Sequence, residues 1–136
     1  MNLLNSHFLK IFLLSSVIAV FSFFKFQQAP AVKAITPQTY KEQVQKGDVL
    51  VDVRTPAEFR SGHVESALNA DFNGGEFAEQ FKNWDKTKTY YLYCASGNRS
   101  GKAAKLMLEA GFKNVYNLGA FKELQANGLP TVQEKQ

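Results

Sequence analysis

Residues Tyr90 to Gly101 read YYLYCASGNRSG, and they set the architecture of the chain. Their first part, together with Thr89, is the strongest β-forming run, because aromatic residues fit a pleated, half-buried surface. Gly97 interrupts the run, and the residues from Ser100 to Ala110 are rich in Ala, Leu, Met and Lys, which favour a helix. The segment therefore predicts a strand, a short loop and a helix, with Cys94 at the carboxyl end of the strand.

Segments on either side continue this alternation of strands and helices. Val49 to Val53 (VLVDV) is a near-continuous β-branched run, which is typical of a buried parallel strand. Thr55 and Glu58 form a capping-box pattern that starts a short helix directly after it. We expect further strands over 67–70 and 115–118, and further helices over 37–45, 76–84 and 121–126. The alternation predicts a single α/β domain with a central parallel sheet flanked by helices on both faces.

The loop after the strand is suited to binding an anion. Ligands of open α/β sheets lie outside the carboxyl ends of the strands, which is where Cys94 falls. Gly97 permits a tight turn in which successive N–H groups point inward, and the start of the next helix adds partial positive charge. Arg99 adds a fixed cation with planar donors. These features favour the thiolate, so the sequence predicts a nucleophilic Cys94 that needs no neighbouring general base.

Composition disfavours several other classes of protein. Three of the sixteen basic residues precede Ile35, which leaves thirteen against twelve acidic residues and gives no basic footprint for nucleic acid. With one cysteine, two histidines and no glycine pattern for phosphates or dinucleotides, we expect neither a metal site nor a cofactor. His63 is interpreted as a structural residue that bonds a nearby loop, and the three tyrosines before Cys94 as strand packing.

The beginning of the chain differs in composition from the rest. It holds an apolar run of fourteen residues, Ile11 to Phe24, preceded by Lys10 and followed by a polar stretch with small residues. As a helix such a run rises about 21 Å, short of the roughly 30 Å of a bilayer core. This pattern is typical of a secretory signal peptide.

The end of this leader is predicted from small residues. We expect cleavage after Ala34, with Ala29 as a second position, while an uncleaved membrane anchor that starts at Phe8 is the alternative. Residues 1–34 are therefore assigned to a signal peptide or anchor and residues 35–136 to one domain. We expect that domain to be periplasmic or otherwise exported, to be monomeric, and to contact a membrane only through an uncleaved leader.

Three segments, in this order, make the chain similar to the rhodanese-like domain family: 52–59 (DVRTPAEF), 62–69 (GHVESALN) and 94–100 (CASGNRS). The resemblance covers about residues 35 to 124. With the leader and the small size, the chain most resembles the small periplasmic thiosulfate sulfurtransferases of the phage-shock type.

The resemblance implies a thiosulfate sulfurtransferase. Cys94 would take the outer sulfur of thiosulfate, or of a similar small anion, and pass it as a persulfide to a thiophilic acceptor such as cyanide. The implied substrate-binding residues are Ala95, Ser96, Gly97, Asn98, Arg99 and Ser100, with the backbone as the cradle and Arg99 on the substrate anion. Six residues from Cys94 to Arg99 are the family's length for sulfur substrates, whereas related phosphatases use a loop one residue longer.

Other residues and functions leave alternatives open. Asp52, Arg54 and Glu58 match the family's first motif and are expected to orient the loop through ion pairs, or else Arg54 and Glu58 form an ordinary i, i+4 helix pair. Asn98 is a candidate for a left-handed backbone and Ser100 for a helix N-cap. The alternative functions are a sulfur carrier or binding module acting on a partner protein, and a phosphatase or arsenate reductase.

Overall fold

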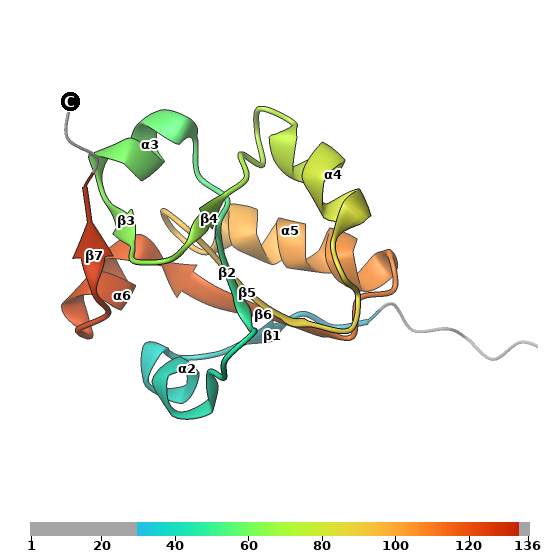
Figure 1. Cartoon of the computed structure of the whole chain (residues 1–136), viewed down its shortest axis with the longest axis horizontal. Coiled ribbons are helices and arrows are strands. Elements are labelled where there is room, and N and C mark those ends of the chain that lie inside the picture. The colour runs from blue at the N-terminus through green and yellow to red at the C-terminus, as the bar shows by residue number, and fades with distance from the viewer. Residues whose placement is uncertain (1–29, 134–136) are drawn as a thin grey trace, which may run out of the picture.

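A five-stranded sheet lies at the centre of the computed structural model, which describes residues 30–133 (Figure 1). The strands stand in the order β1-β6-β5-β2-β4, and all neighbours run parallel. Their bounds are β1 Lys33–Ala34, β2 Val49–Asp52, β4 Leu68–Asn69, β5 Thr89–Cys94 and β6 Asn114–Ala120. The predicted parallel sheet is confirmed, and β5, which ends at Cys94, is its middle strand.

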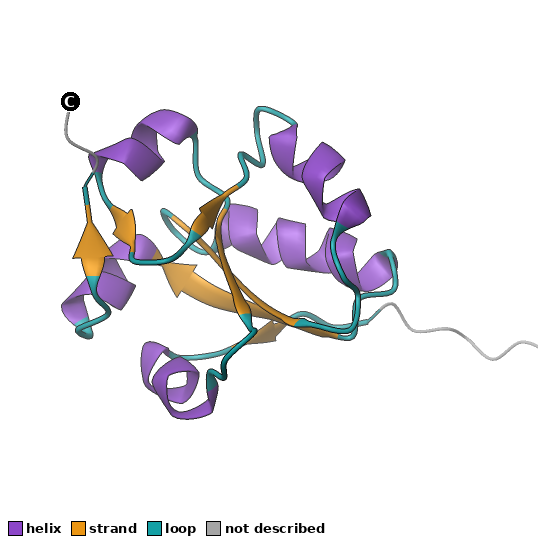
Figure 2. Ribbon diagram, viewed as in Figure 1, coloured by secondary structure: helices purple, strands orange, loops and turns teal. Residues whose placement is uncertain are grey.

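Helices cover both faces of this sheet, as predicted. Their bounds are α2 Pro37–Gln43, α3 Pro56–Ser61, α4 Glu76–Gln80, α5 Asn98–Glu109 and α6 Phe121–Ala126, with a short 3₁₀ helix, η1, over Phe81–Asn83. In Figure 2, α4 and α5 lie on one side of the strands, and α2 and α6 lie on the other. A separate antiparallel pair, β3 (His63–Val64) with β7 (Thr131–Val132), lies beside α6.

The middle strand joins two hydrophobic clusters. Tyr90, Leu92 and Cys94 pack in the cluster under α4 and α5, whereas Tyr91 and Tyr93 pack in the cluster under α2 and α6. Side chains alternate across a strand, so β5 is buried on both faces. Each large apolar side chain buried in this way contributes about 1.5–3 kcal/mol. The tyrosines therefore serve strand packing, as predicted, and the strand end that carries Cys94 is held firmly.

Several predicted boundaries need correction. The first helix, α2, ends at Gln43 rather than Gln45, because Val44 already has an extended backbone. The helix after the cysteine loop, α5, begins at Asn98 rather than Ser100. The predicted helix over 76–84 is α4 followed by η1, and the last strand of the sheet extends over Asn114–Ala120.

Three short strands, β1, β3 and β7, are absent from the prediction. β1 pairs with β6 at the sheet edge, with Lys33 opposite Tyr116, and β7 pairs with β3. Strands of two residues carry no periodicity, so only their distant partners define them. β1 thus lies within the range assigned to the leader, most of which, residues 1–29, lies outside the described residues. Within 30–133, no helix is both long and apolar enough to cross a membrane.

Candidate active site

The cysteine loop turns sharply between β5 and α5. Gly97 takes a left-handed backbone, with φ of 85°, directly before the helix. A Cβ at this position would also lie 3.3 Å from the Cα of Gly119 in β6. A side chain would therefore meet both backbone strain and crowding, so glycine is required here. The turn folds the loop back over the end of the strand.

Hydrogen-bond donors surround the Cys94 sulfur, which is fully buried. The backbone N–H of Gly97 lies 3.1 Å from Sγ, and the Ser100 hydroxyl lies 3.5 Å from it. Burial by itself raises the pKa of this thiol, but the Ser100 hydroxyl and the backbone N–H groups of Ser100, Ser96 and Gly97 lower it more. The net pKa is below its ordinary value, so the site favours the thiolate.

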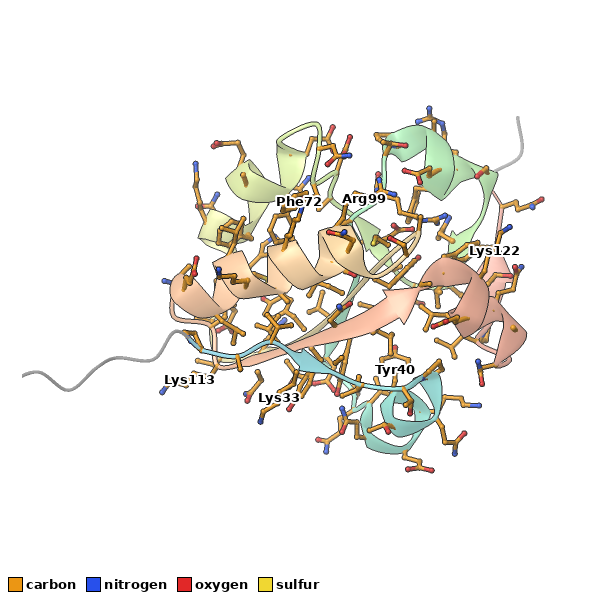
Figure 3. The ribbon with its side chains drawn as sticks, turned by 180° about the vertical axis from the view of Figure 1, so that it is seen from behind. Lys33, Tyr40, Phe72, Arg99, Lys113 and Lys122 are labelled. Atoms are coloured by element: carbon orange, nitrogen blue, oxygen red, sulfur yellow. The ribbon has the colours of Figure 1, made fainter. Side chains whose placement is uncertain are left out.

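Arg99 lies in the first turn of α5 and is labelled in Figure 3. Its guanidinium donates to both carboxylate oxygens of Glu58 on α3, each at 2.8 Å. These hydrogen bonds are the main reason why the pKa of Glu58 is lowered to about 2. Glu58 also accepts from the backbone and hydroxyl of Thr55, which confirms the predicted capping box. The loop arginine is thus held in place from a second helix.

Asp52 and Arg54 form a separate ion pair at the end of β2. Nη2 of Arg54 lies 2.7 Å from Oδ2 of Asp52, and its Nε lies 3.0 Å from both oxygens. Nη2 also donates to the carbonyl of Gly62 at 2.6 Å, and the guanidinium stacks 4.2 Å from the ring centre of Phe121. This pair is buried and joins β2 to the chain before β3 and to α6.

The alternative i, i+4 pair between Arg54 and Glu58 is wrong. Thr55 is the N-cap of α3, so Arg54 lies before the helix and its side chain does not share a helical face with Glu58. Asn69 on β4 adds to the order of this segment, because its amide donates to the carbonyl oxygens of Asp52 and Arg54. Of the three predicted supporting residues, Asp52, Arg54 and Glu58, it is Glu58 that binds Arg99.

The remaining loop residues divide into an exposed rim and a buried anchor. Ala95, Ser96 and Asn98 are exposed, whereas Ser100 is fully buried in α5. Two local predictions are corrected here. Gly97, not Asn98, takes the left-handed backbone, and Ser100 lies inside the helix rather than at its N-cap.

Asn117 on β6 contacts this site and was missed from the sequence. Its Oδ1 accepts the Ser100 hydroxyl at 2.8 Å, and its Nδ2 donates to the carbonyl of Gly97 at 3.0 Å. A signal for it exists in the sequence, since an amide side chain interrupts the otherwise apolar run from Val115 to Leu118. Asn117 is half-buried, and polar groups withdrawn from water usually have a hydrogen-bonding role.

His63 has a structural role, as predicted, but it bonds helix α3 rather than a loop. Its Nδ1 lies 2.9 Å from the carbonyl oxygen of Phe59, and the two rings stack with centres 3.6 Å apart. Between residues 30 and 133, no group of three or more His, Cys, Asp or Glu side chains is placed to hold a metal ion. The described site is therefore built from one sulfur, its amide and hydroxyl donors, and an arginine.

Comparison with known proteins agrees with this geometry. Residues 36–127 match the rhodanese-like domain. The uncharacterized protein YqhL of Bacillus subtilis is 37% identical over 98 residues, covering 71% of this chain and 75% of that protein. The thiosulfate sulfurtransferase GlpE of Pseudomonas syringae is 33% identical over 98 residues, covering 72% and 91%. The thiosulfate sulfurtransferase PspE of Escherichia coli is 33% identical over 76 residues, covering 54% and 71%.

A solved structure shares the fold as well. The structure described as rhodanese with anions from E. coli superimposes with a TM-score of 0.56 at 30% identity, covering 64% of this chain and 99% of that one. The parallel sheet, the cysteine loop and the matched sequence range lead to one assignment: the chain belongs to the rhodanese-like domain family.

Proposed function

We propose that the protein is a thiosulfate sulfurtransferase that works through a persulfide on Cys94. The observation that carries this proposal is the ring of donors at Sγ, with the N–H of Gly97 at 3.1 Å and the Ser100 hydroxyl at 3.5 Å. Such donors stabilise negative charge on sulfur, first as thiolate and then as persulfide anion. The relatives GlpE and PspE, which are named thiosulfate sulfurtransferases, support the same substrate.

The reaction has two displacement steps. The Cys94 thiolate attacks the outer sulfur of thiosulfate, a bond forms to Sγ, and the sulfur–sulfur bond of thiosulfate breaks, with its electron pair leaving on sulfite. A thiophilic acceptor such as the carbon of cyanide then attacks the outer sulfur of the persulfide. Thiocyanate leaves and the thiolate is restored. Neither step transfers a proton, so a site that stabilises charge is sufficient.

Arg99 has the role of a fixed cation at the rim of the loop. Its two terminal nitrogens bind Glu58, so the guanidinium attracts the donor anion from a defined place rather than as a mobile side chain. The backbone of residues 95–100 forms the cradle beneath it. A loop of six residues from Cys94 to Arg99 encloses one sulfur, which favours sulfur transfer over phosphoryl transfer.

We also propose that the protein is exported as a monomer. The apolar run from Ile11 to Phe24 supports a secretory leader, with a membrane anchor as the alternative. The intact mass of protein purified from its native compartment shows whether the leader has been removed. A mass equal to that of a chain starting at residue 30 or 35 supports cleavage, and a full-length mass supports the anchor.

Thiocyanate formation from thiosulfate and cyanide tests the activity. The parent protein is expected to turn over, and Cys94→Ser is expected to lose the activity because it removes the nucleophile. Equal thermal unfolding of the two proteins shows that the variant is folded. A parent no faster than Cys94→Ser overturns the proposal.

Mass spectrometry separates the alternatives if turnover is absent. A Cys94-dependent gain of one sulfur atom, without thiocyanate formation, favours a carrier that serves a partner protein. Cys94-dependent hydrolysis of an aryl phosphate favours a phosphatase.

A further inference from the structure

Asn117 is fixed in place by an irregularity of β6. The strand pairs regularly with β5 as far as Leu92 opposite Asn117, and the register then shifts so that Tyr93 lies opposite Gly119. Bulges beside active sites commonly re-aim a side chain. Here Oδ1 of Asn117 accepts the N–H of Gly119 at 3.1 Å. The shifted backbone thus sets the orientation of the amide.

The same amide reaches two of the residues that donate to the sulfur, Gly97 and Ser100. Its Oδ1 accepts the Ser100 hydroxyl at 2.8 Å, and its Nδ2 donates to the Gly97 carbonyl at 3.0 Å. Helix α5 leaves room for it, since a Cβ at Gly101 would lie 3.2 Å from Nδ2. One side chain on β6 therefore ties the cysteine loop to the first turn of α5.

We infer that Asn117 is a positioning residue. It holds Gly97 and Ser100 where the N–H of Gly97 and the O–H of Ser100 reach the sulfur of Cys94. The importance of Asn117 for catalysis rests on the proposed function. Ser100 has a single hydroxyl hydrogen and two acceptors, Oδ1 of Asn117 at 2.8 Å and Sγ at 3.5 Å. The hydroxyl bonds Asn117 while the sulfur is neutral. It turns to the sulfur once that is ionised, because a charged acceptor binds more strongly.

The charges near the sulfur come from other elements. Arg99 lies on α5, five residues after Cys94, and its partner Glu58 comes from α3. The Asp52–Arg54 pair stands at the end of the neighbouring strand β2. Asn117 itself is uncharged, so its effect on the sulfur comes from hydrogen bonds, and a substitution there leaves these ion pairs intact.

Asn117→Asp tests the inference. The carboxylate holds the Ser100 hydrogen more firmly, no longer donates to the Gly97 carbonyl, and adds negative charge one hydroxyl away from the sulfur. All three changes disfavour the thiolate, so we expect the Cys94 pKa to rise by about one unit and alkylation by iodoacetamide near neutral pH to slow about tenfold.

Asn114→Asp is the matched control, because it makes the same change at the exposed far end of β6. We expect it to leave alkylation within about twofold of the parent rate. Asn117→Gln is the second variant, in case a carboxylate at this half-buried position prevents folding. Its longer side chain displaces the two donors without adding charge, so the Cys94 pKa is expected to rise by a smaller amount.

A double variant shows whether Asn117 acts through Ser100. In Ser100→Ala, the slowing caused by Asn117→Asp is expected to shrink, because the hydroxyl that it holds is gone. An undiminished slowing, or an unshifted Cys94 titration in the folded Asn117 variants, overturns the inference. Alkylation needs no turnover, so a parent that forms no thiocyanate but shows these shifts disproves the proposed function and leaves the inference standing.

Discussion

Arg54 and Arg99 each hold a carboxylate with two nitrogens, but their surroundings differ. The side chains of Arg54 and Asp52 are 6% and 0% exposed, whereas those of Arg99 and Glu58 are 19% and 36% exposed. The buried pair is also closed off by the Gly62 carbonyl and the Phe121 ring. The other pair stands at the rim of the cysteine loop.

This difference in burial indicates that the two ion pairs have different roles, one in stability and one in the active-site loop. A buried ion pair becomes costly once one partner is removed, because the other charge stays unpaired in a poorly solvated place. A partly exposed pair is screened by water and contributes less to stability. Arg54 is therefore expected to matter for folding, and Arg99 for the geometry of the loop.

Removing Arg54 is expected to have the largest effect. Arg54→Leu leaves Asp52 buried without its partner, so the free energy of unfolding should fall by about 3–5 kcal/mol. Urea denaturation at neutral pH measures this. Arg60→Leu, at an exposed position of α3, is the matched control and should change stability by no more than about 0.5 kcal/mol. If Arg54→Leu lowers the free energy of unfolding as little as Arg60→Leu does, the Arg54–Asp52 pair is no more important for stability than an exposed arginine.

Changing Arg99 is expected to affect activity more than stability. Arg99→Lys keeps the charge but loses the bidentate fork, and a charge-assisted hydrogen bond lost in this way lowers kcat/KM for thiosulfate by about 10- to 100-fold. Unfolding should change by less than about 1 kcal/mol. Steady-state kinetics and urea denaturation of the same preparation check both parts. A loss of stability as large as that of Arg54→Leu contradicts the comparison.

The smallest expected effect is a pH dependence from Glu58. Its pKa in the fold is about 2, below the ordinary 4.5, so its stabilisation is fully present above about pH 4.5 and is lost as pH falls toward 2. Glu58→Gln lacks this contribution. The difference in melting temperature between parent and variant should therefore shrink as pH falls through this window, and a constant difference contradicts the assignment.

The sequence predicted most of the fold because its elements carry local signals. The β-branched run of β2, the aromatic run of β5 and the capping box at Thr55 each specify an element without distant partners. The two-residue strands β1, β3 and β7 carry no such signal and were missed. β1 depends on its pairing with β6, and β3 and β7 depend on their pairing with each other.

The candidate site divides in the same way. Cys94, Gly97 and Arg99 lie within six residues of chain, so their spacing alone brings them to one turn. Asn117 lies on another strand, and it enters the site only because β6 pairs beside β5 with a shifted register. Nothing local in the sequence specifies that register.

Local sequence patterns were enough to predict the alternation of strands and helices, the place of Cys94 at a strand end, and the glycine turn that aims amides at its sulfur. The tertiary structure decided which carboxylate each arginine binds, and which amide holds the Ser100 hydroxyl. These two kinds of interaction act over different distances along the chain. Backbone preference and capping act within a few residues, whereas ion pairs and side-chain hydrogen bonds join whichever groups the packed sheet brings within about 3 Å.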